Sequence, residues 1–419
     1  LRAYEAFHVK GEVVMPKLSA KLLPLFQDVW QRGSLPPTAI QDVELHIAEQ
    51  ALLTLNGATH AVYSELLSFE TTHRHIMVIA CPDQAFYPDA VRAYLQKQGI
   101  QPLQQYSVLY PHQFLDKKDG HGLLLIFHFA AATLPSIQYV QQSVTHILQG
   151  VEASVTDFPD MLGTLENIAA HLAEDDAETA DLLRWMLDDH YLLFGVFHVQ
   201  TTCRNMGICR RKRLLSDIIP QALEALDGIT TPKNAGMQWL HLGALFNHIY
   251  AHTNVRAVQF AWRERGKMRS LILLGHFSRS ARYTNTTQLP VFRNVWAKMV
   301  EDAVLQQSAF YQREMRLLVD RAPKSLMHSI DSKQWLAPFK AMIDLHSPTE
   351  AVVARLQPKH GNVAYLLIAV NQHRFGDEIW AKMVKCLVFL GVRTVGYEGY
   401  VIGNTQLVFA AVSAEVWPH

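Results

Sequence analysis

Three histidines have a spacing that could support metal chemistry. His241, His248 and His252 are seven and four residues apart, so a helix would place all three on one face. Histidines at positions i and i+4 of a helix can bind zinc. The chain has 21 histidines, which makes such a coincidence common, and no fourth ligand is evident beside these three. We therefore interpret them as part of an ordinary helix, Trp239–His252, and we expect neither a metal nor another cofactor in this chain.

The densest basic run, Arg210-Arg211-Lys212-Arg213, could hold a phosphate or an acidic partner. Lysine plus arginine and aspartate plus glutamate number 38 each, which gives a formal net charge of +0. No overall field therefore favours nucleic acid or an anionic membrane surface. We interpret the run as a solvated rim at the end of a strand, and we predict no nucleic-acid partner.

Cysteine usage and hydropathy indicate the compartment. The four cysteines are too few and too scattered for a disulfide framework, so we expect free thiols in a cytoplasmic protein. The longest apolar run, Gly122–Leu134, contains His128 and is too short to span a bilayer, which predicts no membrane partner. Because the chain starts at Leu1 and not at methionine, we expect it to be a piece of a longer protein.

Length and periodicity predict several domains of α+β class. The chain has 419 residues, of which 49% are hydrophobic, and this is enough for several cores. Residues 1–60 are predicted as N-terminal helices and residues 61–158 as a first domain with the order β-α-β-β-α. This is the order of a ferredoxin-like (ACT-type) unit, in which helices cover one face of an antiparallel sheet. The predicted elements are His75–Cys81, Pro88–Gln98, Leu103–Tyr110, His121–Ala130 and Pro135–Gln149, and no later segment is evident as a closing strand.

The loop between the first strand and the first helix of this unit is the candidate effector site. It comprises Pro82, Asp83 and Gln84. A helix N-terminus supplies free N–H groups for a carboxylate, and Asp83 could bind an ammonium group, so the loop could hold an amino acid. The alternative, which we favour, is that Pro82 and Asp83 only start the helix, since the same residue types are ordinary caps.

Three further regions complete the predicted organisation. Residues 159–190 form a helical connector, 191–330 a second α+β region and 331–419 a third domain of the ACT-like type. In the connector, Asp175 and Glu178 have the pattern of an N-cap with its reciprocal partner. The expected helices are Pro159–Leu172, Ala177–Asp189, Leu289–Gln307, Phe310–Asp320 and Phe375–Leu390. The expected strands are Tyr191–Gln200, Met206–Cys209, Asn254–Arg263, Met268–Phe277, Ala351–Leu356, Val363–Val370, Val392–Tyr400 and Gln406–Val412.

Three segments resemble, in order, parts of the large NAD-specific glutamate dehydrogenases of bacteria. Leu183–Asp189, which reads LRWMLDD, is similar to an L-R-W-L-x-D-D string of that family. Leu274–Arg293 is similar to the stretch L-G-L-F-T-S-x-A-Y and to the I-P-L-L-R that follows it, and Val370–Phe375 is similar to a strand end that reads V-P-R-D-R-F. Together the three segments extend over nearly the whole chain.

The resemblance implies a region that lies ahead of the catalytic part of such an enzyme. It implies ACT-like regulatory modules with a PAS-like element in 191–330, and a downstream catalytic domain that binds NAD. The parent enzyme would convert L-glutamate and NAD to 2-oxoglutarate, ammonia and NADH. This chain has no G-x-G-x-x-G between a strand and a helix and no glycine-rich segment with a reactive lysine, which agrees with a non-catalytic region.

We therefore expect a region that regulates and oligomerises the parent enzyme. Its expected partners are the downstream catalytic domain, further copies of the chain in a homo-oligomer, and an amino-acid effector. The alternative is a free-standing ACT-like sensor or interaction protein without enzyme activity.

Overall fold

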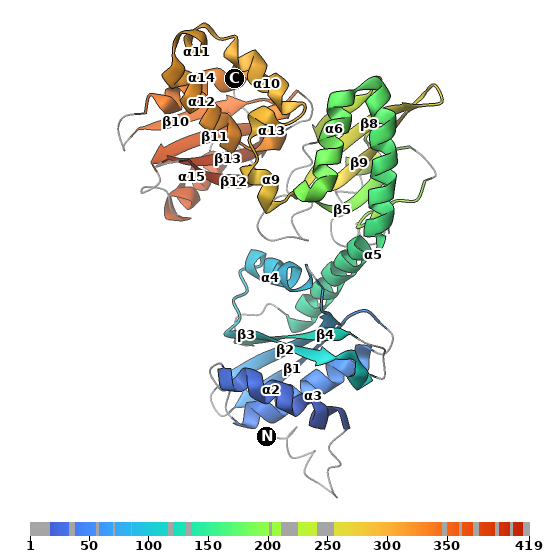
Figure 1. The fold of residues 1–419 in the computed structure, drawn as a ribbon. Helices are drawn as coiled ribbons and strands as arrows, with labels where there is room; N and C mark the ends of the chain where they lie inside the picture. Colours follow the sequence, from blue (N-terminus) through green and yellow to red (C-terminus); the bar gives the residue numbers. More distant parts are fainter. Residues whose placement is uncertain are drawn as a thin grey trace, which may run out of the picture. The chain divides into compact units, whose positions relative to one another are not determined.

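The computed structural model describes residues 17–32, 38–55, 58–69, 72–84, 86–115, 120–130, 136–200, 203–210, 225–240, 255–345, 350–359, 363–371, 377–389, 394–402 and 405–413. These residues form helices and three antiparallel sheets, which confirms the mixed α+β class (Figure 1). The contacts within the chain define two compact units, and the boundary between them lies between Glu152 and Ala153. None of the described helices combines the length and the apolar character that crossing a bilayer requires.

The first sheet has four strands in the order β1-β2-β4-β3. Helix α4 (Tyr87–Lys97) joins β2 to β3, and β4 lies between these two strands. The edge beside β2 is occupied by β1, which precedes the other strands in sequence and was not predicted. Because β1 and β2 form a local hairpin, their pairing costs little loop-closure entropy. The strands are β1 (Ala61–Phe69), β2 (Thr72–Pro82), β3 (Gln104–Pro111) and β4 (His121–Ala130).

Helices cover both faces of this sheet, so the expectation of one covered face is wrong here. Helices α2 (Lys17–Arg32) and α3 (Thr38–Leu55) share a core with Ile76, Val78 and Ala80 of β2. Figure 1 shows α4 on the opposite side of the sheet. The cause is visible in β4, where every residue from 122 to 129 is buried. A strand that is apolar at successive positions buries both faces, whereas an alternating strand buries one.

Helix α5 (Ile137–Asp175) is continuous through Pro159, where the sequence predicted the start of a separate helix. A proline inside a helix removes one hydrogen bond and costs about 3 kcal/mol. The helix continues because side chains beyond the proline, such as Met161, Leu165 and Leu172, are buried in the core of the second unit. Packing of the apolar face outweighs the local penalty.

The joint between α6 (Ala177–Trp185) and β5 (Tyr191–His198) has different caps from those predicted. The N-cap is Asp176, which accepts a hydrogen bond from the Thr179 N–H at 3.1 Å, and not Asp175. Glu178 does not reach back to the cap but accepts from the Val291 N–H at 2.8 Å and pairs with Arg293. The α-helix ends before the predicted Asp189, and it is followed by a turn over Met186–His190 in which Asp188 and Asp189 have non-helical backbone angles.

A five-stranded sheet follows, in the order β6-β5-β9-β8-β7. One face packs against α5 and α6 through Val258, Phe260 and Leu271. Trp239 lies in β7 and pairs with Val258, so the predicted helix Trp239–His252 is wrong at its start, and residues 241–254 lie outside the described part of the chain. Besides β5 the strands are β6 (Met206–Gly207), β7 (Gly236–Leu240), β8 (Arg256–Glu264) and β9 (Lys267–Phe277).

Short helices connect this sheet to the last one. The predicted helix Leu289–Gln307 is interrupted, because Asp302 caps a new helix by accepting from the Val304 N–H at 3.0 Å. The segments are α9 (Arg279–Tyr283), η4 (Thr286–Gln288), α10 (Phe292–Val300), α11 (Ala303–Gln307), α12 (Ala309–Arg321), α13 (Lys324–Ser329) and α14 (Ser332–Ile343).

The last sheet repeats the architecture of the first. Its order is β10-β11-β13-β12, and α15 (Asp377–Phe389) joins β11 to β12 as α4 joins β2 to β3. Trp335 of α14 packs against Phe409 on one face, with ring centroids 6.0 Å apart, and Leu387 of α15 packs in the core of the other face. Both end sheets thus have the arrangement αββαββ, with helices on both faces. The strands are β10 (Ala351–Leu356), β11 (Val363–Asn371), β12 (Thr394–Ile402) and β13 (Thr405–Ser413).

Candidate ligand site on the five-stranded sheet

The predicted effector loop lies on the surface of the first unit. Pro82 is the last residue of β2, Asp83 and Gln84 are exposed, and the Gln84 N–H donates to the Pro82 carbonyl at 2.9 Å. Helix α4 begins at Tyr87 with Phe86 as its N-cap, so the interpretation in which Pro82 and Asp83 start the helix is wrong. Binding of an amino acid by this loop stays a prediction. Burial raises the pKa of the neighbouring Cys81 thiol to about 12, so this thiol is not a nucleophile at neutral pH.

The basic run has a structural role at its first residue. Asp157 of α5 is 2% exposed and accepts from the guanidinium groups of Arg210 and Arg204, at 3.3 and 3.2 Å, and from the Gly207 N–H at 2.9 Å. Arg210 therefore links the segment that contains β6 to α5, which is a structural role beyond that of a solvated residue at a strand end. Residues 211–213 and His241, His248 and His252 lie outside the described residues. Within the described ranges, no three His, Cys, Asp or Glu side chains are grouped to hold a metal ion.

A polar cluster is buried between α2, α3 and the first sheet. Glu44 and His128 are both 0% exposed, and Glu44 Oε1 lies 2.8 Å from His128 Nε2. Glu44 Oε2 accepts from Trp30 Nε1 at 3.0 Å and from the Tyr106 hydroxyl. Burial and the nearby Glu44 raise the pKa of Tyr106. We assign this cluster to stability, since each of its groups would be costly to leave unpaired.

The sequence carried a signal for this cluster that the prediction did not use. His128 interrupts an otherwise apolar strand, and Glu44 lies among apolar residues of α3. A titratable residue at a core position needs a partner, and two such positions on neighbouring elements can partner each other.

A row of hydrogen-bonded polar side chains crosses β7, β8 and β9 in the five-stranded sheet. Strand alternation places Gln238, Gln259 and Ser270 on the face opposite α5 and α6, and Gln259 and Ser270 are at most 1% exposed. Gln238 Nε2 donates to Gln259 Oε1 at 2.6 Å. Gln259 Nε2 donates at 3.0 Å both to the Thr230 carbonyl and to Ser270 Oγ, and Ser270 Oγ lies 3.0 Å from Thr231 Oγ1.

The proton positions along this row follow from its chemistry. The Thr230 carbonyl can only accept, so the amide nitrogen of Gln259 faces it and also donates to Ser270. The buried Ser270 hydroxyl must then give its own hydrogen to Thr231 Oγ1.

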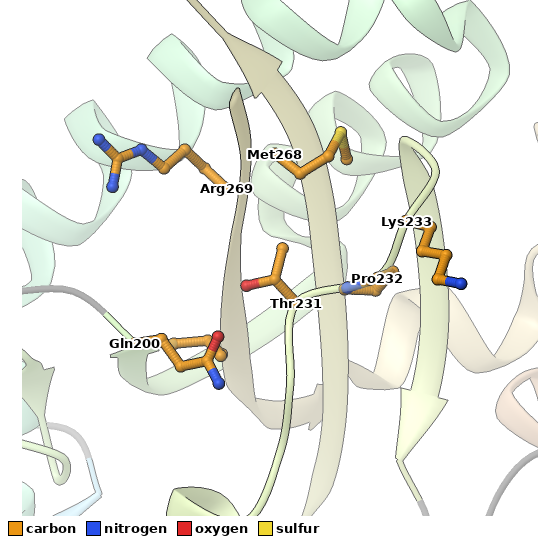
Figure 2. A pocket seen from close by; sticks show the side chains of 7 residues that line it. Gln200, Thr231, Pro232, Lys233, Met268 and Arg269 are labelled. Atoms are coloured by element: carbon orange, nitrogen blue, oxygen red, sulfur yellow. The ribbon is translucent and has the colours of Figure 1, made fainter. Parts of the chain in front are cut away.

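Thr231 lines a cavity of ≈ 460 Å³, which is within the size range of small-molecule pockets, roughly 300–1,000 Å³. Figure 2 shows Arg269 and Lys233 extending in opposite directions, so they do not form a clamp around one ligand. Arg269 Nε lies 3.5 Å from Glu264 Oε2, whereas Lys233 has no ion-pair partner in the described part of the chain. None of the seven described lining residues is acidic: they are Val199, Gln200, Thr231, Pro232, Lys233, Met268 and Arg269.

Lys324 is a buried cation outside this cavity, and it makes stability depend on pH. Its side chain is nearly enclosed at 4% exposure, and burial lowers its pKa to about 8 against the opposing effect of Asp320. Above the unfolded value of 10.5 the lysine is neutral in both states. As pH falls from there to about 8, only the unfolded chain gains the proton, so stability is lost in that window.

Replacing Lys324 with methionine should remove this pH dependence and stabilise the second unit at pH 7 by about 2 kcal/mol. The measurement is urea unfolding at several values between pH 7 and 10. Lys298→Met, at an exposed position of α10, is the control and should leave the pH dependence of the free energy of unfolding unchanged. If the free energy of unfolding of Lys324→Met depends on pH as strongly as that of the unchanged chain, Lys324 is not the source of the pH dependence.

Comparison of the chain with models of known protein families and with characterised protein sequences gives no match. The family resemblance therefore depends on the three short segments alone.

Proposed function

We propose that this chain is the regulatory and oligomerising N-terminal region of a large NAD-specific glutamate dehydrogenase, and that its modules sense a small metabolite. In the parent enzyme, a downstream domain would bind NAD and convert L-glutamate to 2-oxoglutarate and ammonia. This chain would contribute sensing and assembly, and not catalytic groups.

The observation that carries the proposal is the αββαββ arrangement that occurs twice along the sequence, once before and once after the five-stranded sheet. In both end sheets a helix joins two strands, β2 and β3 or β11 and β12, that have a third strand between them, as in ACT-type ferredoxin-like units. The strand that closes such a unit would here precede it, as β1 and as β10. The central sheet, numbered from β5, has the order second-first-fifth-fourth-third, which is that of PAS-like sensor sheets. In sequence order, an ACT-like module, a PAS-like one and a second ACT-like one agree with the region that the resemblance implies.

The alternative is a free-standing sensor or interaction protein with the same modules. The reading frame beyond the codon for His419 separates the two. A long continuation that encodes a strand followed by G-x-G-x-x-G supports the enzyme. A stop codon shortly after His419 would favour the free-standing sensor.

Calorimetric titration of the chain with a panel of L-amino acids tests the sensing function. We expect saturable binding of at least one amino acid. If the loop Pro82–Gln84 is the site, Asp83→Ala should abolish that binding, whereas Asp42→Ala, at an exposed position of α3, should not. Absence of heat for every member of the panel would contradict amino-acid sensing and leave assembly as the role of the modules.

A further inference from the structure

We infer that Glu178 is a latch that holds the turn at the start of α10 in a strained backbone conformation, and that this turn relaxes when the latch opens. The turn comprises Pro290, Val291 and Phe292, and Glu178 lies in α6, 113 residues before Val291. The inference goes beyond the function proposed above and does not depend on the identity of the parent enzyme. It gives the second unit an element with two conformations, which is what a regulatory region needs to transmit a signal.

The first argument is the backbone of Val291. Its φ of 67° and ψ of −47° are those of the γ-turn with positive φ, and the Phe292 N–H donates to the Pro290 carbonyl at 2.7 Å across this turn. Such a turn is rare and strained, and a positive φ is least favourable for a β-branched residue such as valine. Residues in strained conformations persist only where the surrounding structure holds them, and they concentrate at switch regions and ligand sites.

The second argument is that one carboxylate contacts the strained residue directly. Glu178 Oε2 accepts from the Val291 N–H at 2.8 Å and from Arg293 Nε at 3.2 Å, and Glu178 Oε1 pairs with Arg293 Nη2. The hydrogen bond from Arg293 lowers the pKa of Glu178, so the latch is charged at neutral pH. Glu178 therefore binds both the peptide group of Val291 and the guanidinium group that follows it.

The third argument is the difference in burial between the latch and its surroundings. Leu289 and Phe292, on either side of the turn, are 4% and 0% exposed in the core of the second unit. The side chains of Glu178 and Arg293 are 35% and 50% exposed. Water screens an exposed ion pair, which therefore stabilises little, and the strain at Val291 opposes it. The core thus fixes both ends of the turn, whereas its centre is held by a weak contact that can open.

The latch also joins elements that belong to different sheets. Helix α6 packs on the five-stranded sheet, whereas α10 packs against α14, whose Trp335 lies against Phe409 of the last sheet. Opening of the latch would free the first turn of α10 from α6. A change at the five-stranded sheet could therefore reach the helices of the last sheet through this turn.

Hydrogen exchange of the full chain, measured by mass spectrometry on a peptide that covers residues 289–293, tests whether the turn relaxes. Glu178→Ala should speed exchange in this peptide about tenfold or more. Asp181→Ala is the matched control, because it removes an exposed ion pair with Arg184 from the same helix and should leave this peptide unchanged. Glu178→Gln keeps an acceptor for the Val291 N–H but loses the charge, so its exchange rate should lie between the two.

A double-mutant cycle with Val291→Gly tests for strain, which a merely structural contact would not produce. Glycine adopts positive φ without strain, so Val291→Gly relieves strain only where Glu178 still holds the turn. In urea unfolding, its effect on the equilibrium constant should be more favourable, by about tenfold, in the unchanged chain than in Glu178→Ala. Any loss of valine packing is common to both backgrounds and cancels. Equal effects in the two backgrounds, or equal exchange in Glu178→Ala and Asp181→Ala, would overturn the latch.

Discussion

Replacing Glu44 with alanine should lower the free energy of unfolding of the first unit by about 3–5 kcal/mol. The change would leave the buried Trp30 N–H and Tyr106 hydroxyl without their shared acceptor, and it would remove the carboxylate that lies 2.8 Å from His128 Nε2. Hydrogen exchange in increasing urea at the amides of β2 and β4 measures this loss, because those strands report on the first unit alone.

Asp42→Ala is the matched control for this experiment. Asp42 is exposed on the same helix as Glu44, and its loss should change stability by no more than about 0.5 kcal/mol. Glu44→Gln keeps an acceptor for Trp30 and Tyr106, so its loss of unfolding free energy should lie between those of Glu44→Ala and Asp42→Ala. A loss for Glu44→Ala no larger than that for Asp42→Ala would show that the cluster does not hold α3 to the sheet.

Replacing Gly275 with alanine should destabilise the second unit by about 3 kcal/mol. An added Cβ would collide with the Leu192 carbonyl oxygen and lie 2.5 Å from Tyr191 Cε1. The carbonyl belongs to β5, which pairs with β9 at this point, so it cannot move away without breaking the ladder. Hydrogen exchange at β5 and β9 amides, combined with the midpoint of thermal unfolding, measures the effect.

Replacing Gly163 with alanine should have the opposite effect on the stability of the second unit. Gly163 lies inside α5, and among the described residues no atom outside its own helix is within 4 Å of an added Cβ. Alanine is favoured over glycine in a helix interior, so Gly163→Ala should stabilise by about 0.5–1 kcal/mol. Effects of equal sign at the two glycines would contradict the close approach described for Gly275.

Elements with a strong local pattern could be predicted from the sequence. The bounds of β4 and β10 agree with the predicted strands His121–Ala130 and Ala351–Leu356. Both have β-branched or continuous apolar residues between segments of polar and turn residues. The continuous run in β4 also indicated burial on two faces, which the prediction of helices on one face overlooked.

Features that depend on distant contacts could not be predicted in this way. Glu178 has the spacing of a capping box, but its carboxylate accepts hydrogen bonds from Arg293, which lies 115 residues further along the chain. Pro159 would break an isolated helix, yet the core of the second unit holds α5 together around it. The cavity beside Thr231 is assembled from the ends of β5 and β9 and a segment before β7, and none of these has a local motif.

Glutamate-dependent reduction of NAD tests the central claim most directly. The intact polypeptide, purified from its source, and the 419-residue chain should be assayed side by side for NADH formation with L-glutamate and NAD. We predict NADH formation by the intact polypeptide and none by the chain alone. An intact polypeptide that forms no NADH from glutamate, or an isolated chain that does, would contradict the proposal that this chain is the regulatory region of a glutamate dehydrogenase.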